Sequence, residues 1–417
     1  MRNRLKIRIG LAAMVVALFA LPSLHVAASA ADAPAAPTVT AKLAKPLKAA
    51  QEAMAAKNWD AALAAIKEAQ AVPVEKSAFD NYIMNAWLSV IYQQKQDVAN
   101  EILALQIASE SQYASAEQQK AWLKAIVGLY FTQKDYAKVV ESGQTALKHI
   151  PSDPDILTSI ADAQNRLGKY KEAAAAIQQV IDRQDKPDEK LLAFQWNCYS
   201  KANDDAGAAR VIEKLVTYYP KPDYWLNALA PILRSDIKDA HLQLDVYRFM
   251  NEVGVLKRSV DYADMAELAL DQGFPGESQA ALEHAFAQNV FTEQRDKDRY
   301  QHLLDGAKQR AVNDQAMLAA AERDAGNAAS GDALVQVGAA FLSYGQPDKA
   351  VADISKGIAK GMLKNADEAN LLLGMAQLKA KNSVEAVRAF EKAATSSTPG
   401  YARLGKLWAL HAGAHNA

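Results

Sequence analysis

Hydrophobic and polar residues alternate through most of this chain with the period of an amphipathic α-helix, and the pattern recurs in successive segments. The clearest segment has a small residue at Gly338, an aromatic residue at Phe341, a turn at Gly345 and a second small residue at Ala350. Small side chains let two helices approach closely, and large ones fill the space toward the next pair. The segment therefore predicts a hairpin of two helices, which we call the A helix and the B helix.

The hairpins are predicted to repeat at a nearly constant interval. Val139, Ala173 and Ala208 occupy equivalent B-helix positions 34 and 35 residues apart, and Ala350 and Ala386 are 36 residues apart. Short turns that contain Gly, Pro or Lys-Asn separate the helices. No stretch of useful length alternates as a strand does, so the whole repeat is expected to be helical.

These repeated positions resemble those of the tetratricopeptide repeat (TPR) superfamily over nearly all of the chain after its first 41 residues. The resemblance implies an all-α fold, a right-handed α-solenoid of stacked TPR-type hairpins. We expect eight to ten hairpins over residues 42–399, with the poorest match in residues 293–327. An amphipathic helix over residues 401–411 is expected to cap the last hairpin, so that residues 400–417 hold this capping helix and a frayed tail.

The first 30 residues have the three parts of a secretory signal peptide. Positively charged residues lie within residues 2–8, residues 9–21 are apolar, and Ala28-Ser29-Ala30 supplies a small-residue cleavage site. The alternative is an uncleaved anchor, for which the apolar run is short, because a bilayer span needs roughly 20 residues. Cleavage would leave an Ala/Pro-rich flexible leader (31–41) and no second apolar stretch of spanning length, so no stable membrane insertion is expected. We therefore predict a soluble periplasmic protein.

Two stretches carry a closer resemblance. Residues 215–226, with the run Tyr-Pro-Lys-Pro-Asp-Tyr-Trp, and residues 356–376, with Lys-Gly-Ile and Leu-Leu-Leu-Gly-Met-Ala, are similar to bacterial periplasmic TPR proteins often encoded beside TonB–ExbB–ExbD energy-transduction systems. The resemblance implies an envelope accessory or scaffold. That family offers no catalytic residues to transfer to this sequence.

The net charge and the motifs of the sequence reduce the classes of partner and of activity that we expect. The formal net charge is −1, so no basic excess is present to neutralise nucleic-acid phosphates. No zinc-protease helix, phosphate-binding loop or serine-hydrolase elbow occurs, and the spacing of His411 and His415 is interrupted by Gly413 in the expected tail. The single cysteine, Cys198, is expected to be a buried inert thiol rather than a nucleophile. We predict no enzyme activity, no cofactor and no metal.

A TPR solenoid exposes a concave face lined by A helices, where a protein or peptide can bind. In the usual register Met84, Leu88 and Ile91 lie on this face, giving it an apolar N-terminal end. The polar and aromatic members of the predicted lining are Tyr92, Lys124, Phe131, Asp162, Asn165, Arg166, Asn197, Lys201 and Arg234. The alternative is that these side chains only pack between helices. A clamp for a peptide carboxylate is not predicted, because Thr158 replaces a required Lys.

Three hypotheses for function follow. The first is a periplasmic scaffold that binds an envelope protein, plausibly a component of a TonB-type transport system. The second is a chaperone or assembly factor for exported proteins, which would bind many unfolded clients without preferring one. The third, of another class, is a hydrolase or ligand-binding enzyme on a helical scaffold, which would need a cleft with convergent polar groups.

Overall fold

The computed structural model of the protein describes residues 37–234 and 239–414. Within these residues the chain forms twenty α-helices and one short 3-10 helix, and no strand, which confirms the all-helical prediction. No helix in the described residues is both long and apolar enough to cross a membrane. The predicted signal peptide, most of the predicted leader and the last three residues of the predicted tail lie outside the described residues.

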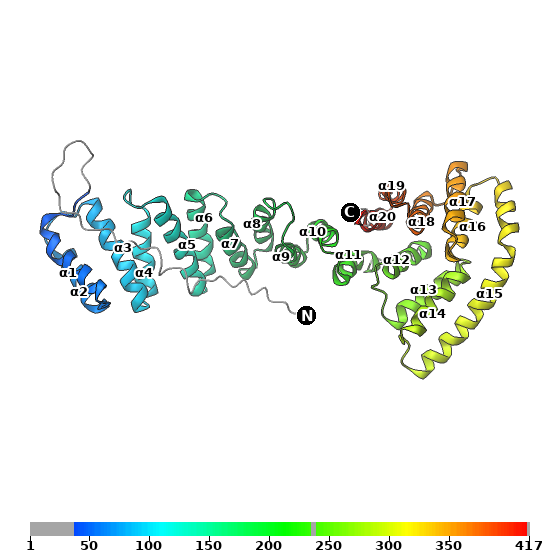
Figure 1. Cartoon of the computed structure of the whole chain (residues 1–417), viewed down its shortest axis with the longest axis horizontal. Helices are drawn as coiled ribbons and strands as arrows, with labels where there is room; N and C mark the ends of the chain where they lie inside the picture. Colours follow the sequence, from blue (N-terminus) through cyan, green and yellow to red (C-terminus); the bar gives the residue numbers. More distant parts are fainter. Residues whose placement is uncertain (1–36, 235–238, 415–417) are drawn as a thin grey trace. The chain divides into compact units, whose positions relative to one another are not determined.

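The chain divides into two compact units, residues 1–205 and 206–417, and each is described by itself. The first unit begins with the 3-10 helix Ala41–Leu43 and continues as a series of helices, each packed on the next (Figure 1). Its helices are α1 (Ala44–Ala55), α2 (Trp59–Ala71), α3 (Ala78–Lys95), α4 (Val98–Ser109), α5 (Ala116–Thr132), α6 (Tyr136–His149), α7 (Pro154–Arg166), α8 (Tyr170–Ile181) and α9 (Glu189–Lys201).

Local sequence explains where these helices begin and turn. Ser77 and Ser115 each form a capping box with the residue three positions later, which satisfies free amides at the starts of α3 and α5. The turn between α7 and α8 passes through Gly168, whose φ of 77° favours glycine. Apolar faces of α1 to α5 then form one continuous core around Trp87 and Trp122. The hairpins therefore stack through shared apolar side chains, as the repeat predicted.

The second unit contains α10 to α20, the first of which starts at the unit boundary (Figure 1). Nearly all of residues 293–327, where the repeat was weakest, form one helix of 34 residues, Gln294–Asn327, in which buried side chains recur at intervals of three, four or seven positions. The helices are α10 (Asp205–Tyr218), α11 (Pro222–Arg234), α12 (Ala240–Glu252), α13 (Ser259–Asp271), α14 (Pro275–Ala287), α15 (Gln294–Asn327), α16 (Asp332–Ser343), α17 (Pro347–Lys360), α18 (Ala366–Lys379), α19 (Ser383–Ala393) and α20 (Pro399–Ala414).

Small residues lie where paired helices of this unit cross. A Cβ atom on Gly338 of α16 would lie 2.5 Å from Ile354 Cγ1 of α17, and one on Gly374 of α18 would lie 2.4 Å from the Phe390 ring of α19. Real Cβ atoms do not approach other heavy atoms this closely, so only glycine permits these crossings. The interpretation of the small positions as helix-crossing points is confirmed for both hairpins.

Helix α20 covers α19, as expected of a capping helix, and it also contacts α11 and α12. Trp408 stacks on Phe390 of α19 with ring centroids 5.1 Å apart and lies 4.6 Å from the Phe249 ring of α12. Trp225 of α11 packs edge-on against Phe249. The end of the second unit is thereby joined to its beginning, a contact that the repeat pattern did not predict.

Gly405 should be among the least replaceable residues of α20. An added Cβ would lie 2.6 Å from the backbone nitrogen of Ala394 and 2.8 Å from the carbonyl oxygen of Phe390, neither of which can rotate away. We expect Gly405→Ala to lower the free energy of unfolding by about 1–3 kcal/mol, measured by urea unfolding. Gly413→Ala is the matched control in the same helix, because its Cβ would meet nothing within 4 Å. Equal stabilities of the two variants would contradict this packing.

The stability of the first unit should depend on pH, because one of its carboxyl groups is buried. Glu101 on α4 is 5% exposed, and burial raises the pKa of its carboxyl from 4.5 to about 7. Because the folded pKa exceeds the unfolded one, the unfolded chain binds fewer protons between these values, and stability falls as pH rises through that window. Between about pH 4.5 and pH 8, we expect the free energy of unfolding of the wild type to fall by up to about 3 kcal/mol relative to that of Glu101→Gln. Urea unfolding midpoints of both proteins, measured across this pH range, test the prediction. Glu68→Gln, on an exposed α2 position, should behave as the wild type.

Candidate functional site

Eight of the nine predicted lining residues lie in the first unit. The ninth, Arg234, ends α11 in the second unit, and its side chain lies outside the described residues. The predicted apolar end does not form a surface, because Met84, Leu88 and Ile91 are at most 5% exposed and belong to the core. For these three residues the packing alternative is correct. Half-buried Tyr92 packs against the same core, and its burial, with Asp97 beside it, raises the pKa of its phenol.

Lys124 joins successive hairpins by ion pairs. Its Nζ lies 2.8 Å from Asp153 Oδ2 and 2.7 Å from Asp155 Oδ2, at the start of α7. Asp153 is the N-cap of α7 and accepts hydrogen bonds from the amides of Asp155 and Ile156. Burial raises the pKa of Asp153, but the Lys124 ammonium and these amides outweigh it and hold the pKa below the usual value. The ion pairs of Lys124 therefore hold α5 against the start of α7.

Arg166 at the end of α7 is the most constrained of the predicted residues. Its Nε and Nη2 donate to the carboxylate of Asp162 over 3.1 and 3.2 Å, and its Nη1 donates to the Tyr136 hydroxyl over 3.1 Å. Its guanidinium lies 5.4 Å from the centroid of Phe131 and 5.2 Å from that of Tyr136, within cation–π range. Three side chains, one each from α5, α6 and α7, thus orient one exposed cation.

One repeat further on, Lys201 at the end of α9 is placed in the same way. Its Nζ lies 5.3 Å from the Tyr170 ring centroid and 3.5 Å from Asn165 Oδ1. Arg166 and Lys201 are 35 residues apart, and Tyr136 and Tyr170 are 34 apart. In both cases a cation that ends an A helix covers the aromatic residue that begins the B helix of the preceding hairpin.

The structure therefore brings seven of the predicted residues into one partly exposed series on α5, α7 and α9. Asn197 is exposed and lies one turn before Lys201 on α9. The aromatic partners Tyr136 and Tyr170 were not predicted as site residues, although an aromatic residue at the first position of two successive B helices was a usable signal. We call the following set the A-helix strip: Lys124, Phe131, Asp162, Asn165, Arg166, Asn197 and Lys201.

A cavity of about 410 Å³ lies on the other side of α5, between the B helices α4 and α6. Leu123, Ile126 and Tyr130 of α5 line it with apolar atoms, and polar side chains of α4 and α6 complete the walls. Two large aliphatic residues of α4, Leu103 and Ile107, are more than half exposed. The repeat pattern did not predict this cavity, because a groove between B helices leaves no signature in the pattern.

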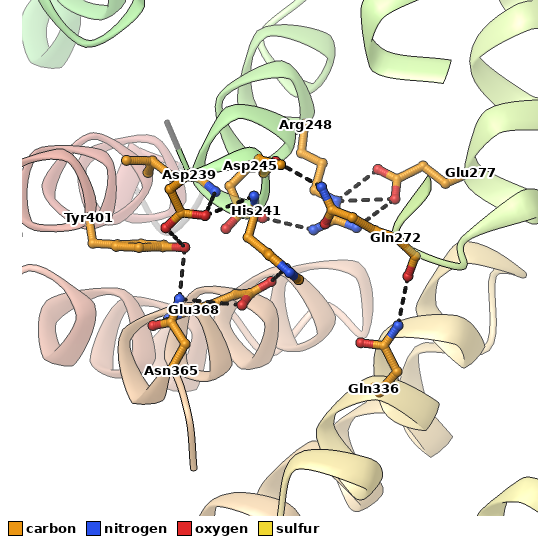
Figure 2. A network of polar contacts seen from close by, with 12 residues as sticks. Asp239, His241, Asp245, Arg248, Gln272, Glu277, Gln336, Asn365, Glu368 and Tyr401 are labelled. Carbon is orange, nitrogen blue, oxygen red and sulfur yellow. Dashed lines mark hydrogen bonds and ion pairs between the residues drawn. The ribbon is translucent and has the colours of Figure 1, made fainter. Parts of the chain in front are cut away.

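The second unit has a polar network that the repeat pattern did not predict (Figure 2). Arg248 of α12 lies 2.8 Å from Asp245 Oδ1 and 2.6 Å from Glu277 Oε2 of α14. Burial raises the pKa of Asp245 and Arg248 opposes this rise. Burial would lower the pKa of Arg248, but the two carboxylates outweigh it and raise that pKa. The buried guanidinium of Arg248 is thus paired with two carboxylates.

The same network continues from α12 to α18 and α20 (Figure 2). His241 Nδ1 lies 2.8 Å from Glu368 Oε1, and the hydroxyl of Tyr401 donates to Asp239 Oδ2 over 3.2 Å. Asn365 donates to the Tyr401 hydroxyl over 2.9 Å. His241 and Glu368 are 127 positions apart in the sequence, and Asp239 and Tyr401 are 162 apart, so no local motif could have indicated these contacts.

Cys198 is fully buried on α9, and burial raises the pKa of its thiol to about 12, so the thiol stays protonated at neutral pH. This agrees with the expected inert cysteine. In the parts of the chain that the structure describes, no three His, Cys, Asp or Glu side chains are arranged to hold a metal ion.

No protein-family model matches the sequence, and no curated protein is similar to it in sequence. Among solved structures, a tetratricopeptide repeat protein from Parabacteroides merdae is 16% identical, with 71% of this chain and 99% of that chain covered and a TM-score of 0.31. The complex of the TPR2AB domain of yeast Sti1 with pHSP90 is 17% identical, with coverage of 71% and 99% and a TM-score of 0.23.

The apo form of RapI is 13% identical, with 84% of this chain and 99% of that chain covered and a TM-score of 0.26. Identities and TM-scores this low do not transfer a function. The TPR-like character of this chain rests on its own stacked hairpins and on the spacing of their small residues.

Loss of Lys124 should leave the buried carboxylate of Asp153 without its closest cation. We expect Lys124→Met to lower the free energy of unfolding by about 1–2 kcal/mol, because the remaining amide hydrogen bonds compensate only in part. Thermal unfolding followed by circular dichroism measures this. Lys120→Met is the matched control, because Lys120 lies 3.8 Å from the same carboxylate and is more exposed. An equal loss in both variants would contradict the specific role of Lys124.

Proposed function

We propose that the protein is a non-catalytic scaffold of the bacterial periplasm, and that it binds a segment of another protein on the A-helix strip. The observation that carries this proposal is the fixed placement of Arg166 and Lys201 over Tyr136 and Tyr170. Two exposed cations are held in one orientation, one repeat apart, on stacked helices. Such an arrangement suits recognition of a polar segment that extends along several hairpins.

Pre-ordered side chains favour binding because little conformational entropy remains to be lost. Immobilising a long side chain at an interface costs about 0.5–1.5 kcal/mol, and the contacts with Asp162, Phe131 and Tyr136 already restrict Arg166. Asn197 adds an exposed amide that can both donate and accept hydrogen bonds. The strip therefore offers the cations of Arg166 and Lys201 and the amide of Asn197 to a polar partner.

The location and the partner class form a finer part of this proposal. The basic, apolar and small-residue segments of residues 1–30 support export, and the resemblance of residues 215–226 and 356–376 to TonB-associated periplasmic proteins supports an envelope partner. We propose the periplasmic part of a TonB–ExbB–ExbD-type component as that partner.

Site-specific photocrosslinking in cells tests the surface and the partner together. A photoreactive phenylalanine at position 197, on the strip, should give one dominant adduct that contains an envelope protein. The same group at position 67, an exposed site on α2, is the control and should give none. Adducts of equal yield at both positions, or no adduct at position 197, would refute binding on the strip.

The composition of the adduct separates the hypotheses. A single partner of the TonB type supports the accessory role, whereas a ladder of many exported proteins from position 197 would support the chaperone instead. Arg166→Ala should lower the yield of the position-197 adduct severalfold, because the guanidinium is then missing, while folding is monitored by circular dichroism.

A further inference from the structure

The outer face of α4 differs from those of the other B helices in the first unit. The exposed residues of α2, α6 and α8 are alanines or polar residues, whereas Leu103 and Ile107 of α4 are more than half exposed. On its other side α4 buries Ile102 and Leu105 in the core. A helix with large apolar residues all round is ordinarily buried, so the outer face of α4 is expected to have a partner.

This exposed face of α4 leads into the cavity between α4 and α6. Gln106, Ile107 and Glu110 follow Leu103 at three, four and seven positions, which places all four residues on one face of the helix. Gln106 and Glu110 line the cavity of about 410 Å³. From position 103 to position 110 the helix advances about 10 Å. The cavity and the two exposed aliphatic residues therefore form one surface, which we call the α4 groove.

The floor of the α4 groove is apolar. Helix α5 packs against both α4 and α6, and its nearly buried residues Leu123 and Ile126 line the cavity. Tyr130, one turn further along α5, adds an aromatic ring to the lining. Covering these side chains together with Leu103 and Ile107 removes apolar surface from water. The α4 groove therefore favours a partner with more than one large apolar side chain.

The walls of the cavity are acidic. Glu110 of α4 and Glu141 of α6 line it from two different helices, and both are exposed. Lys138 also lines the cavity, but its ammonium lies 5.3 Å from the centroid of the Tyr130 ring, within cation–π range. His149 contributes an imidazole. Two carboxylates face one ammonium that the lining itself already holds, so the cavity is complementary to a further cationic group.

We propose that the α4 groove binds an amphipathic helix of a partner protein, which places large apolar residues on Leu103 and Ile107 and a Lys or Arg side chain in the cavity. A basic side chain suits this cavity because it combines an aliphatic stem with a charged end. The stem would lie on the apolar floor, and the charged end would meet Glu110 and Glu141. An amphipathic helix laid in a groove is a recurring mode of recognition.

The extent of the apolar surface favours a helix over a small molecule. A small cation that filled the cavity would leave Leu103 and Ile107 in water, whereas a helix that lies along α4 covers both. The α4 groove is formed mainly by B helices, on the other side of α5 from the A-helix strip. The proposal therefore adds a second binding surface to the protein, and its test does not depend on the strip.

Binding of a designed peptide to the protein that begins at residue 31 tests the proposal. The probe is a fluorescein-labelled peptide of about 18 residues, long enough to form a helix. One face carries two leucines one turn apart and an arginine one turn further on, and the rest is alanine and glutamine. Fluorescence anisotropy should show saturable binding with a Kd below about 100 μM. The same peptide with glutamate in place of arginine should bind about threefold more weakly or worse. Failure to saturate, or equal affinity of the two peptides, would overturn the proposal.

Surface variants locate the bound peptide. Ile107→Ser should weaken binding at least about fivefold, because the leucines of the peptide lose an apolar contact. The double variant Glu110→Gln with Glu141→Gln should remove the preference for the arginine peptide. Leu167→Ser is the matched control, because Leu167 is an exposed aliphatic residue outside the groove, and it should bind as the wild type does. Equal affinity of Ile107→Ser and the wild type would place the peptide elsewhere and refute the assignment.

Two further measurements identify a different occupant. Butylguanidinium, which has the charged end of an arginine side chain without a helix, should compete only at concentrations far above those of the peptide. Competition at equal concentration would show that the cavity is a site for a small cation instead. Sedimentation of the protein alone should give the same mass for the wild type and Ile107→Ser. A dimer that Ile107→Ser converts to a monomer would show that a second copy of this chain covers the groove.

Discussion

Close approach of two helices at small side chains is the constraint on which the rest of this structure depends. Gly338 against Ile354 and Gly374 against Phe390 leave no room for a single methyl group. Once two helices meet at such a point, their crossing angle and separation are set by the ridges of larger residues around it. Each hairpin then presents its remaining apolar residues to the next one, and stacking follows because no hairpin can bury them alone.

The same constraint explains the A-helix strip. When successive hairpins are held in register, the end of one A helix falls beside the start of the preceding B helix. At this position Arg166 lies over the ring of Tyr136, and Lys201 lies over the ring of Tyr170. An aromatic face beneath a cation removes little of its hydration and restricts its orientation. The strip is therefore a consequence of the stacking, in which the charged groups stay accessible and are nevertheless well placed.

Sequence alone could predict the parts of this structure whose contacts repeat. The small residues, the Gly and Pro turns and the period of about 34 residues are local signals, and they indicated the hairpins. They also placed the strip residues on A helices, whereas binding on the strip stays a prediction. The contacts that join α12 to α18 and α20 could not be predicted, because residues such as His241 and Glu368 are 127 positions apart and belong to no periodic pattern. Residues 293–327 gave only a helical period, and the absence of a turn signal there corresponds to the single helix α15. The burial of Met84, Leu88 and Ile91 went against the usual register, because these residues meet core atoms that the register does not describe.

Charged side chains lie near solvent in the first unit and include a buried cluster in the second. In the first unit, charged groups of the strip stay near solvent, where pairs such as Arg166 with Asp162 contribute little to stability but fix orientation. In the second unit Arg248 is buried between Asp245 and Glu277, and burying such ions costs much of what their attraction returns. Stability of the closed unit must then come mainly from the apolar rings of Trp225, Phe249 and Trp408. The ionic contacts around those rings join particular helices, since Arg248 pairs α12 with α14 and Lys379 pairs α18 with α12.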